Sequence, residues 1–311
     1  MANLPSQIIK VSRPVHWVKN LALFAALIFS RQLFVAIPFI RVLWAFAAFS
    51  LASSAAYIFN DVLDAKFDKL HPIKKNRPIA SGKLPVPIAL LVAFAFALIS
   101  LYLAACLNSI FFFLVLTYII FQIAYSLGLK NIVIIDILII AAGFIIRVYA
   151  GAFVIDAHLS VWFLLCVISV ALFLASGKRR AELNLIKETS EITRKSLTIY
   201  KRELLNSYVT MFGNAAWMSW ALYSFFESPK ASLPVWLFLA ELSRTTTVNK
   251  LFMITIPVVI FGIMRYQSLI FEDRTEAPEK LLLTDRPLIA SALIYGALII
   301  WILYGGISVI A

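Results

Sequence analysis

Long apolar segments, separated by short charged ones, run through almost the whole chain of 311 residues. Most of them reach the roughly 20 residues that a helix needs to cross the hydrocarbon core of a bilayer. Nine can be counted, at approximately 16–30, 33–59, 85–106, 109–127, 132–153, 159–177, 207–227, 250–268 and 287–309. Hydrophobic residues make up 62% of the chain and charged residues 14%, against about 45–50% and 25% in soluble domains. We therefore expect an all-α, polytopic membrane protein of about nine transmembrane helices, folded as a single domain over residues 1–311.

Two apolar stretches fit the spanning pattern less well. The segment at 16–30 is short, which allows a tilted or partly interfacial helix. The segment at 232–242 is too short to span, and we interpret it as a surface helix or as an extension of the seventh helix.

The distribution of basic residues predicts the orientation in the membrane. With the N-terminus in the cytoplasm, 22 of the 28 Lys and Arg residues lie in cytoplasmic segments and 5 lie outside, and Arg147 falls within a helix. Cytoplasmic loops of membrane proteins carry such an excess. We expect a multi-pass protein of the inner (plasma) membrane with its C-terminus outside. The net charge of +12 reflects this topology or an affinity for anionic substrates. No domain-sized basic segment suggests nucleic-acid binding.

Three carboxylates follow one another at helical spacing at the cytoplasmic end of the second segment. Residues 60–68 read Asn-Asp-Val-Leu-Asp-Ala-Lys-Phe-Asp, so Asp61, Asp64 and Asp68 fall within an arc of about 60° on one helical face. Carboxylates this close repel one another unless a cation lies between them. Oxygen ligands suit Mg²⁺, or Mn²⁺ in its place, completed by phosphate oxygens of a substrate. The alternative is a solvated helix end.

A basic, proline-containing turn follows the acidic face directly. Residues 71–82 read His-Pro-Ile-Lys-Lys-Asn-Arg-Pro-Ile-Ala-Ser-Gly, and they include Lys74 and Arg77. Cations beside a bound metal can bind the phosphate oxygens of a diphosphate that the metal leaves uncovered. The alternative is that these charges only keep the loop in the cytoplasm.

The acidic run, followed by Arg-Pro-Ile-Ala-Ser-Gly, resembles the first aspartate-rich motif of the UbiA prenyltransferase superfamily. The resemblance implies helices around a central cavity, an active site on the cytoplasmic side, and catalytic roles for Asn60, Asp61 and Asp64. In that family, a second aspartate-rich motif follows the sixth helix. Here residues 178–206 contain no Asp, four Glu and eight Lys or Arg.

The chain resembles one branch of this superfamily, the polyprenyl-phosphate phosphoribosyltransferases. The resemblance rests on this departure and on residues 13–20, 125–130 and 176–183. That branch implies transfer of 5-phosphoribose from phosphoribosyl pyrophosphate to a polyprenyl phosphate, a type of reaction that supplies cell-wall arabinan precursors. The alternative is an aromatic prenyltransferase that uses a polyprenyl diphosphate. A transporter is disfavoured because the polar residues gather at one rim.

The substrate-binding candidates are cations at the cytoplasmic rim and polar residues near them: Lys19, Asn20, Lys74, Arg77, Tyr125, Lys130, Asp136, Lys178, Arg179 and Tyr200. Alternatives stay open for some of them. Lys178 lies one helical turn from Glu182, with which it can pair, and Tyr200 can equally anchor a membrane interface. Arg147 lies at membrane depth, where it either pairs structurally or lines a polar cavity.

Overall fold

A computed structural model describes residues 4–70, 74–188, 199–227, 250–272 and 284–304 of the chain. Every regular element in these ranges is helical. The elements form two compact units, one before residue 158 and one after it.

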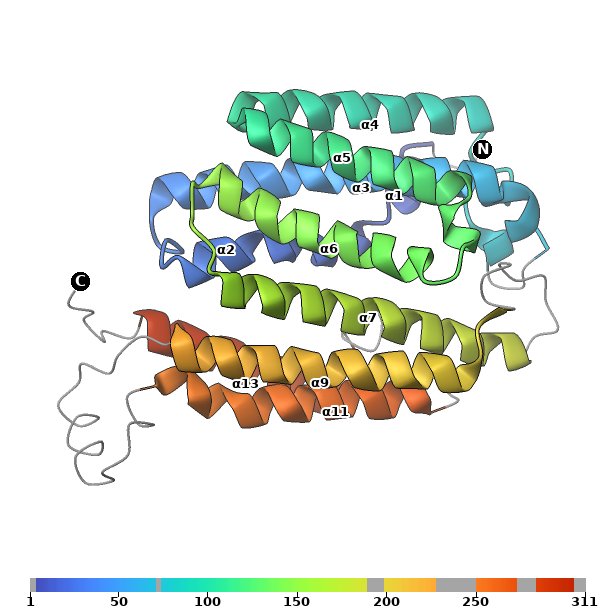
Figure 1. The fold of residues 1–311 in the computed structure, drawn as a ribbon. Helices are drawn as coiled ribbons and strands as arrows, with labels where there is room; N and C mark the ends of the chain where they lie inside the picture. Colours follow the sequence, from blue (N-terminus) through green and yellow to red (C-terminus); the bar gives the residue numbers. More distant parts are fainter. Residues whose placement is uncertain (1–3, 71–73, 189–198, 228–249, 273–283, 305–311) are drawn as a thin grey trace, which may run out of the picture. The chain divides into compact units, whose positions relative to one another are not determined.

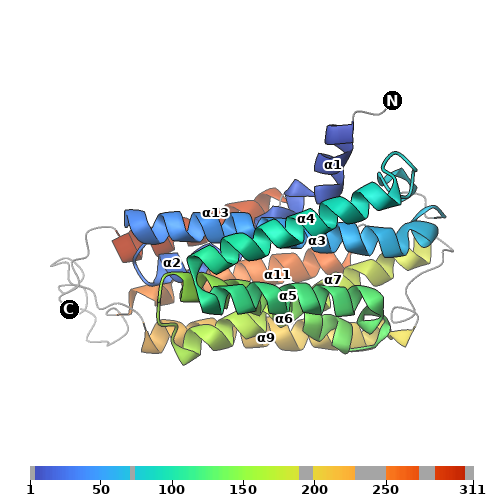
Figure 2. The same cartoon turned by 90° about the horizontal axis from the view of Figure 1, so that it is seen from above.

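The first unit is built around the long helix α3 (Ala36–Asp68), which packs along α4 and also contacts α5 and α6 (Figures 1 and 2). Its other elements are α1 (Leu4–Ser12), η1 (Pro14–Leu23), α2 (Phe24–Phe29), η2 (Lys74–Asn76), α4 (Val86–Leu107), α5 (Ser109–Leu127), η3 (Leu129–Asn131) and α6 (Ile135–Val154).

Small residues on α3 allow its neighbours to approach closely. Ala45, Ala48, Ala52 and Ser53 are all buried, as expected where helix backbones come close together in a membrane. On α4, Ser100 donates a hydrogen bond to the carbonyl oxygen of Ala48 (2.7 Å). This bond satisfies a polar hydroxyl inside an apolar bundle.

The segment predicted at 16–30 is not one regular transmembrane helix. It folds as the 3-10 segment η1 followed by the short helix α2. η1 lies against both α3 and α6. Gly151 on α6 makes this contact possible, because a Cβ there would lie 2.0 Å from the carbonyl oxygen of Leu23.

The second unit consists of α7, α9 and α11, which run alongside one another, with α13 packed on α11 (Figure 1). Their bounds are Val161–Glu188 (α7), Arg202–Phe226 (α9), Leu251–Thr255 (η5), Ile256–Phe271 (α11) and Arg286–Tyr304 (α13). The guanidinium of Arg265, on α11, pairs through two nitrogens with the carboxylate of Asp285 (2.7 and 3.1 Å), and Asp285 also caps α13 by accepting from the Leu288 amide.

Seven helices in the described part of the chain are long and apolar enough to cross a membrane. They confirm an all-α, polytopic membrane protein, whereas the predicted count of nine is not confirmed. The segment 14–29 is a shorter apolar stretch, and α9 is long enough but insufficiently apolar to be among the seven. The stretch at 232–242 lies outside the described residues.

Candidate functional site

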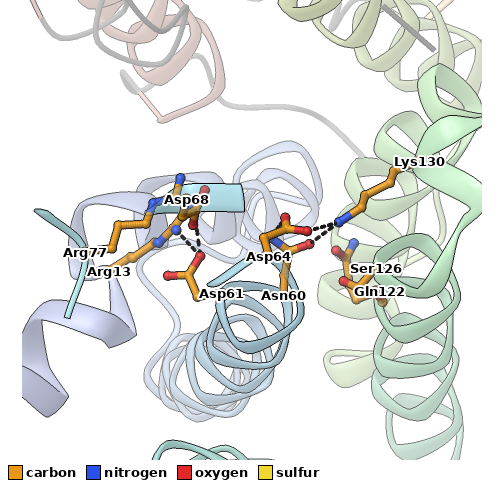
Figure 3. A network of polar contacts seen from close by, with 9 residues as sticks. All are labelled: Arg13, Asn60, Asp61, Asp64, Asp68, Arg77, Gln122, Ser126 and Lys130. Carbon is orange, nitrogen blue, oxygen red and sulfur yellow. Dashed lines mark hydrogen bonds and ion pairs between the residues drawn. The ribbon is translucent and has the colours of Figure 1, made fainter. Parts of the chain in front are cut away.

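The acidic face predicted from the sequence is helical, because α3 continues without a break to Asp68. Asp61 is 2% exposed and Asp68 is also buried. Arg77 bridges them: its Nη1 donates to Asp61 Oδ1 (3.0 Å) and to Asp68 Oδ2 (2.6 Å). Arg13 Nη2 donates to the same Asp61 oxygen (2.5 Å) (Figure 3). Two guanidinium groups therefore converge on one buried carboxylate.

The third carboxylate, Asp64, turns away from this pair towards the segment between α5 and α6 (Figure 3). Lys130 Nζ donates to Asp64 Oδ1 (2.6 Å) and to Asn60 Oδ1 (3.3 Å). The Asn60 amide in turn donates to Asp64 Oδ2 (3.0 Å). Lys130 is buried although it lies in the short element η3. This contact joins residues that are 66 positions apart in the sequence.

The donor atoms fit a hard divalent cation in kind, since carboxylate and amide oxygens are the ligands that Mg²⁺ prefers. In the part of the chain that the structure describes, no three His, Cys, Asp or Glu side chains are grouped to hold a metal ion. The three carboxylates are paired with three basic side chains instead. Mg²⁺ commonly uses one or two carboxylates together with substrate phosphates, so an all-protein cage is not required.

A cavity of about 280 Å³ opens beside Asp61. Its walls include Lys10 and Arg13 from the N-terminal segment and Lys74 and Arg77 from the turn after α3. The structure thus brings the predicted residues Lys74 and Arg77 together with Asp61. Lys10 and Arg13 were not among the predicted site residues. The only signal for Arg13 was its place in the motif at residues 13–20.

Arg13 reaches Asp61 from an unusual backbone conformation. Its φ and ψ are 51° and 61°, in the left-handed region, and it precedes a proline. A non-glycine residue there costs roughly 1–2 kcal/mol. Ser54 on α3 holds the turn from both sides, because its hydroxyl donates to the Ser12 carbonyl (2.9 Å) and accepts from the Trp17 indole (3.0 Å). The guanidinium also lies over the ring of Tyr57.

Asn20, a predicted substrate ligand, is fully buried in a second polar cluster of the first unit. Arg147 Nε donates to its Oδ1 (2.7 Å), and Arg147 Nη2 donates to the Tyr118 hydroxyl (2.8 Å). Arg147 also donates to the Gly143 carbonyl (2.6 Å). The structure therefore gives Arg147 a role in joining η1, α5 and α6, which is the pairing alternative that the sequence left open.

The remaining candidates of the first unit are Lys19, Tyr125 and Asp136. Lys19 is half-buried on η1, and Tyr125 is half-buried on α5. Asp136 is fully buried in the first turn of α6, where its Oδ1 accepts from the Ile137 amide (2.9 Å).

The basic candidates of the second unit lie on a helix, not in the loop that the sequence suggested, because α7 extends to Glu188. Lys178 is half-buried. Arg179 is fully buried and pairs with Glu182, one turn further along. Arg180, a third basic residue of this segment, donates to Asn206 on α9 (2.5 Å). Tyr200 is buried just before α9.

Comparison with known proteins agrees with this fold and with the acidic motif. Residues 21–283 match the UbiA prenyltransferase family, and the chain belongs to it. It is 34% identical to the decaprenyl-phosphate phosphoribosyltransferase of Corynebacterium glutamicum, over 97% of this chain and 88% of the relative. It is 37% identical to the enzyme of the same name from Mycolicibacterium smegmatis, over 72% of this chain and 71% of the relative.

A solved structure also has this fold. It is a UbiA homologue from Archaeoglobus fulgidus bound to GPP and Mg²⁺, with a TM-score of 0.68, and the match covers 95% of this chain and 97% of that one. The two sequences are 17% identical, so the likeness establishes the fold alone.

Proposed function

We infer that this protein transfers 5-phosphoribose from phosphoribosyl pyrophosphate to a polyprenyl phosphate and releases pyrophosphate. The observation that carries this conclusion is the 34% identity, along 97% of the chain, to a relative named for that reaction. The basic residues at the start of 178–206, where other family members place carboxylates, agree with it. The family match covers elements of both compact units, which supports one functional domain.

The acidic face is the proposed position of the donor's diphosphate. Asp61 and Asp64, with Asn60 and Asp68 beside them, would hold a divalent cation, with Mg²⁺ as the first choice and Mn²⁺ as a substitute. When bound, this ion neutralises charge that develops on the leaving pyrophosphate. Binding of the ion requires the carboxylates to share or release their present partners, Arg13, Arg77 and Lys130.

The chain's own contribution is electrostatic and positional. A ribosyl transition state resembles an oxocarbenium ion, so a strong protein nucleophile is not needed. An oxygen of the lipid phosphate forms the bond to the anomeric carbon, while the bond from that carbon to pyrophosphate breaks and its electron pair leaves with pyrophosphate. Arg77 and Lys130, already fixed by carboxylates, can donate charge-assisted hydrogen bonds to phosphate oxygens without reorganising far.

The other candidates have supporting roles in this proposal. Lys19, Tyr125, Asp136, Lys178, Arg179 and Tyr200 are proposed to contact substrate or to orient residues that do. For Asn20, complete burial against Arg147 favours an orienting role. We further propose that the site faces the cytoplasm, because the basic residues gather on that side.

This site is tested by replacing its carboxylates and measuring the release of pyrophosphate. Asp61→Asn and Asp64→Asn should each lower turnover by at least about a hundredfold, and excess EDTA should abolish it until Mg²⁺ is restored. Asp156→Asn is the matched control, because Asp156 lies in the turn after α6 with a positive φ that Asn tolerates. Full activity in EDTA, or equal effects in all three variants, would refute the assignment.

A further inference from the structure

The cavity beside Asp61 carries more positive charge than the carboxylate within it can balance. Four of its lining side chains are basic (Lys10, Arg13, Lys74 and Arg77), and Asp61 is the one acidic residue among them. Arg77 is shared with Asp68, but Lys10 is exposed at the rim. A concave wall of this charge attracts an anion with several oxygen atoms.

Arg13 is held in place before any ligand arrives. Its backbone is fixed in the left-handed region between α1 and η1. Ser54 secures the residues on both sides of it, and Asp61 and Tyr57 fix the guanidinium. A strained residue that its surroundings hold so firmly is typical of a functional position. Little side-chain entropy is left to lose when Arg13 binds a phosphate oxygen.

The cationic wall adjoins an apolar surface. α1 buries Val11 against Ile58 and Ile79, whereas Ile9 is 63% exposed and Val15 is 70% exposed. In a membrane protein, exposed apolar side chains next to basic ones lie at the boundary between hydrocarbon and headgroups. Lys10 and its exposed apolar neighbours therefore suit the phosphate and the chain of a membrane lipid.

We propose that this cavity binds the phosphate headgroup of the acceptor lipid, with Arg13 and Lys10 as its ligands. The assignment rests on the proposed function, because it requires a polyprenyl phosphate as the acceptor. It places the attacking phosphate next to Asp61, which is assigned to the donor's leaving group. The cations at this wall bind the phosphate monoester of the lipid. If they bind the phosphates of the donor instead, the test below shows it.

The test compares apparent KM values of the full-length protein for each substrate at saturating concentration of the other. In Lys10→Gln, KM for the polyprenyl phosphate should rise about tenfold or more, while KM for phosphoribosyl pyrophosphate stays unchanged. In Arg13→Gln, the rise in KM for the polyprenyl phosphate should be the larger of the two, because Arg13 also contacts Asp61 on the donor side. Arg31→Gln and Lys75→Gln are the matched controls. Arg31 is another arginine with a positive φ (59°), and Lys75 neighbours Lys74 without lining the cavity.

Each outcome is decisive. A rise only in KM for phosphoribosyl pyrophosphate would assign the cavity to the donor, and unchanged KM values for both substrates would remove it from the site. Either result overturns the proposal. If Arg13→Gln does not fold, Lys10→Gln decides, because Lys10 is exposed. A wild-type protein that transfers no phosphoribose would refute the proposed function instead, before any variant is compared.

Discussion

Two glycines on α6 should respond in opposite ways to the same substitution. A Cβ at Gly151 would lie 2.0 Å from the carbonyl oxygen of Leu23 and 2.8 Å from its carbonyl carbon. A Cβ at Gly143 would meet only side-chain atoms, at 3.4 Å or more. Replacement of a helix-interior glycine by alanine stabilises by about 0.5–1 kcal/mol where there is room. We therefore expect Gly143→Ala to be neutral or slightly stabilising.

At Gly151 the same gain is outweighed. Contacts below 3.0 Å to a Cβ essentially do not occur, so the end of η1 must move by at least about 1 Å in a closely packed interior. Overpacking of this kind costs roughly 1–3 kcal/mol. The upper end applies because the opposing atoms belong to the backbone and cannot rotate away. The net destabilisation of Gly151→Ala should be about 2 kcal/mol.

Thermal unfolding of the two purified variants in the same detergent measures the difference. In a chain of 311 residues each kcal/mol shifts Tm by roughly 1.5 °C, so Gly151→Ala should unfold a few degrees below Gly143→Ala. Equal Tm values would show that η1 does not lie against α6 as described. Movement of η1 should also lower activity, because this segment follows Arg13 and carries Lys19 and Asn20.

Three further results are expected. Arg147→Met should destabilise the protein by about 2–6 kcal/mol, because it removes the Arg147 donors from the buried oxygens of Asn20 and Tyr118 and leaves them only the longer contacts to the Ser53 hydroxyl (3.4 and 3.3 Å); an unchanged Tm would contradict this account of the buried cluster. The Arg265 hydrogen bond lowers the pKa of Asp285 below its usual 3.8, so the stability that Asp285 adds is fully present above about pH 5 and is lost as the pH falls through its lowered pKa. The Tm gap between wild type and Asp285→Asn should therefore shrink in acid, and a gap that widens there would be inconsistent with the ion pair. A cysteine in the turn between η2 and α4 should resist membrane-impermeant thiol reagents added to intact cells, and ready labelling would reverse the proposed orientation.

The sequence predicted the acidic face well because its physical basis is local. Asp61, Asp64 and Asp68 are spaced for one helical face, and the helix that carries them continues through the motif. The same reasoning could not show that the face would divide, with Asp61 and Asp68 turned to Arg77 and Asp64 turned to Lys130. That division depends on contacts between residues far apart in the sequence, which spacing alone does not specify.

Three other features were beyond sequence reasoning, because they too depend on the tertiary structure. The count of nine spanning helices rested on apolar length, which does not separate the 3-10 segment η1 and the short helix α2 from one regular helix. Asn20 was predicted to contact substrate from its place in the motif at residues 13–20, but the tertiary fold buries it against Arg147. Arg13 was passed over because its contact with Asp61 requires a backbone conformation that non-glycine residues rarely adopt.

The choice of donor tests the central claim most directly. Purified protein with Mg²⁺ would be offered labelled phosphoribosyl pyrophosphate with a polyprenyl phosphate and, separately, a polyprenyl diphosphate with an aromatic acceptor. Mass spectrometry of the extracted lipid would identify the product. We expect a lipid heavier by one phosphoribosyl group from the first pair and no product from the second. Prenylation of the aromatic acceptor, with phosphoribosyl pyrophosphate left intact, would contradict the proposed function and leave only the family and the fold standing.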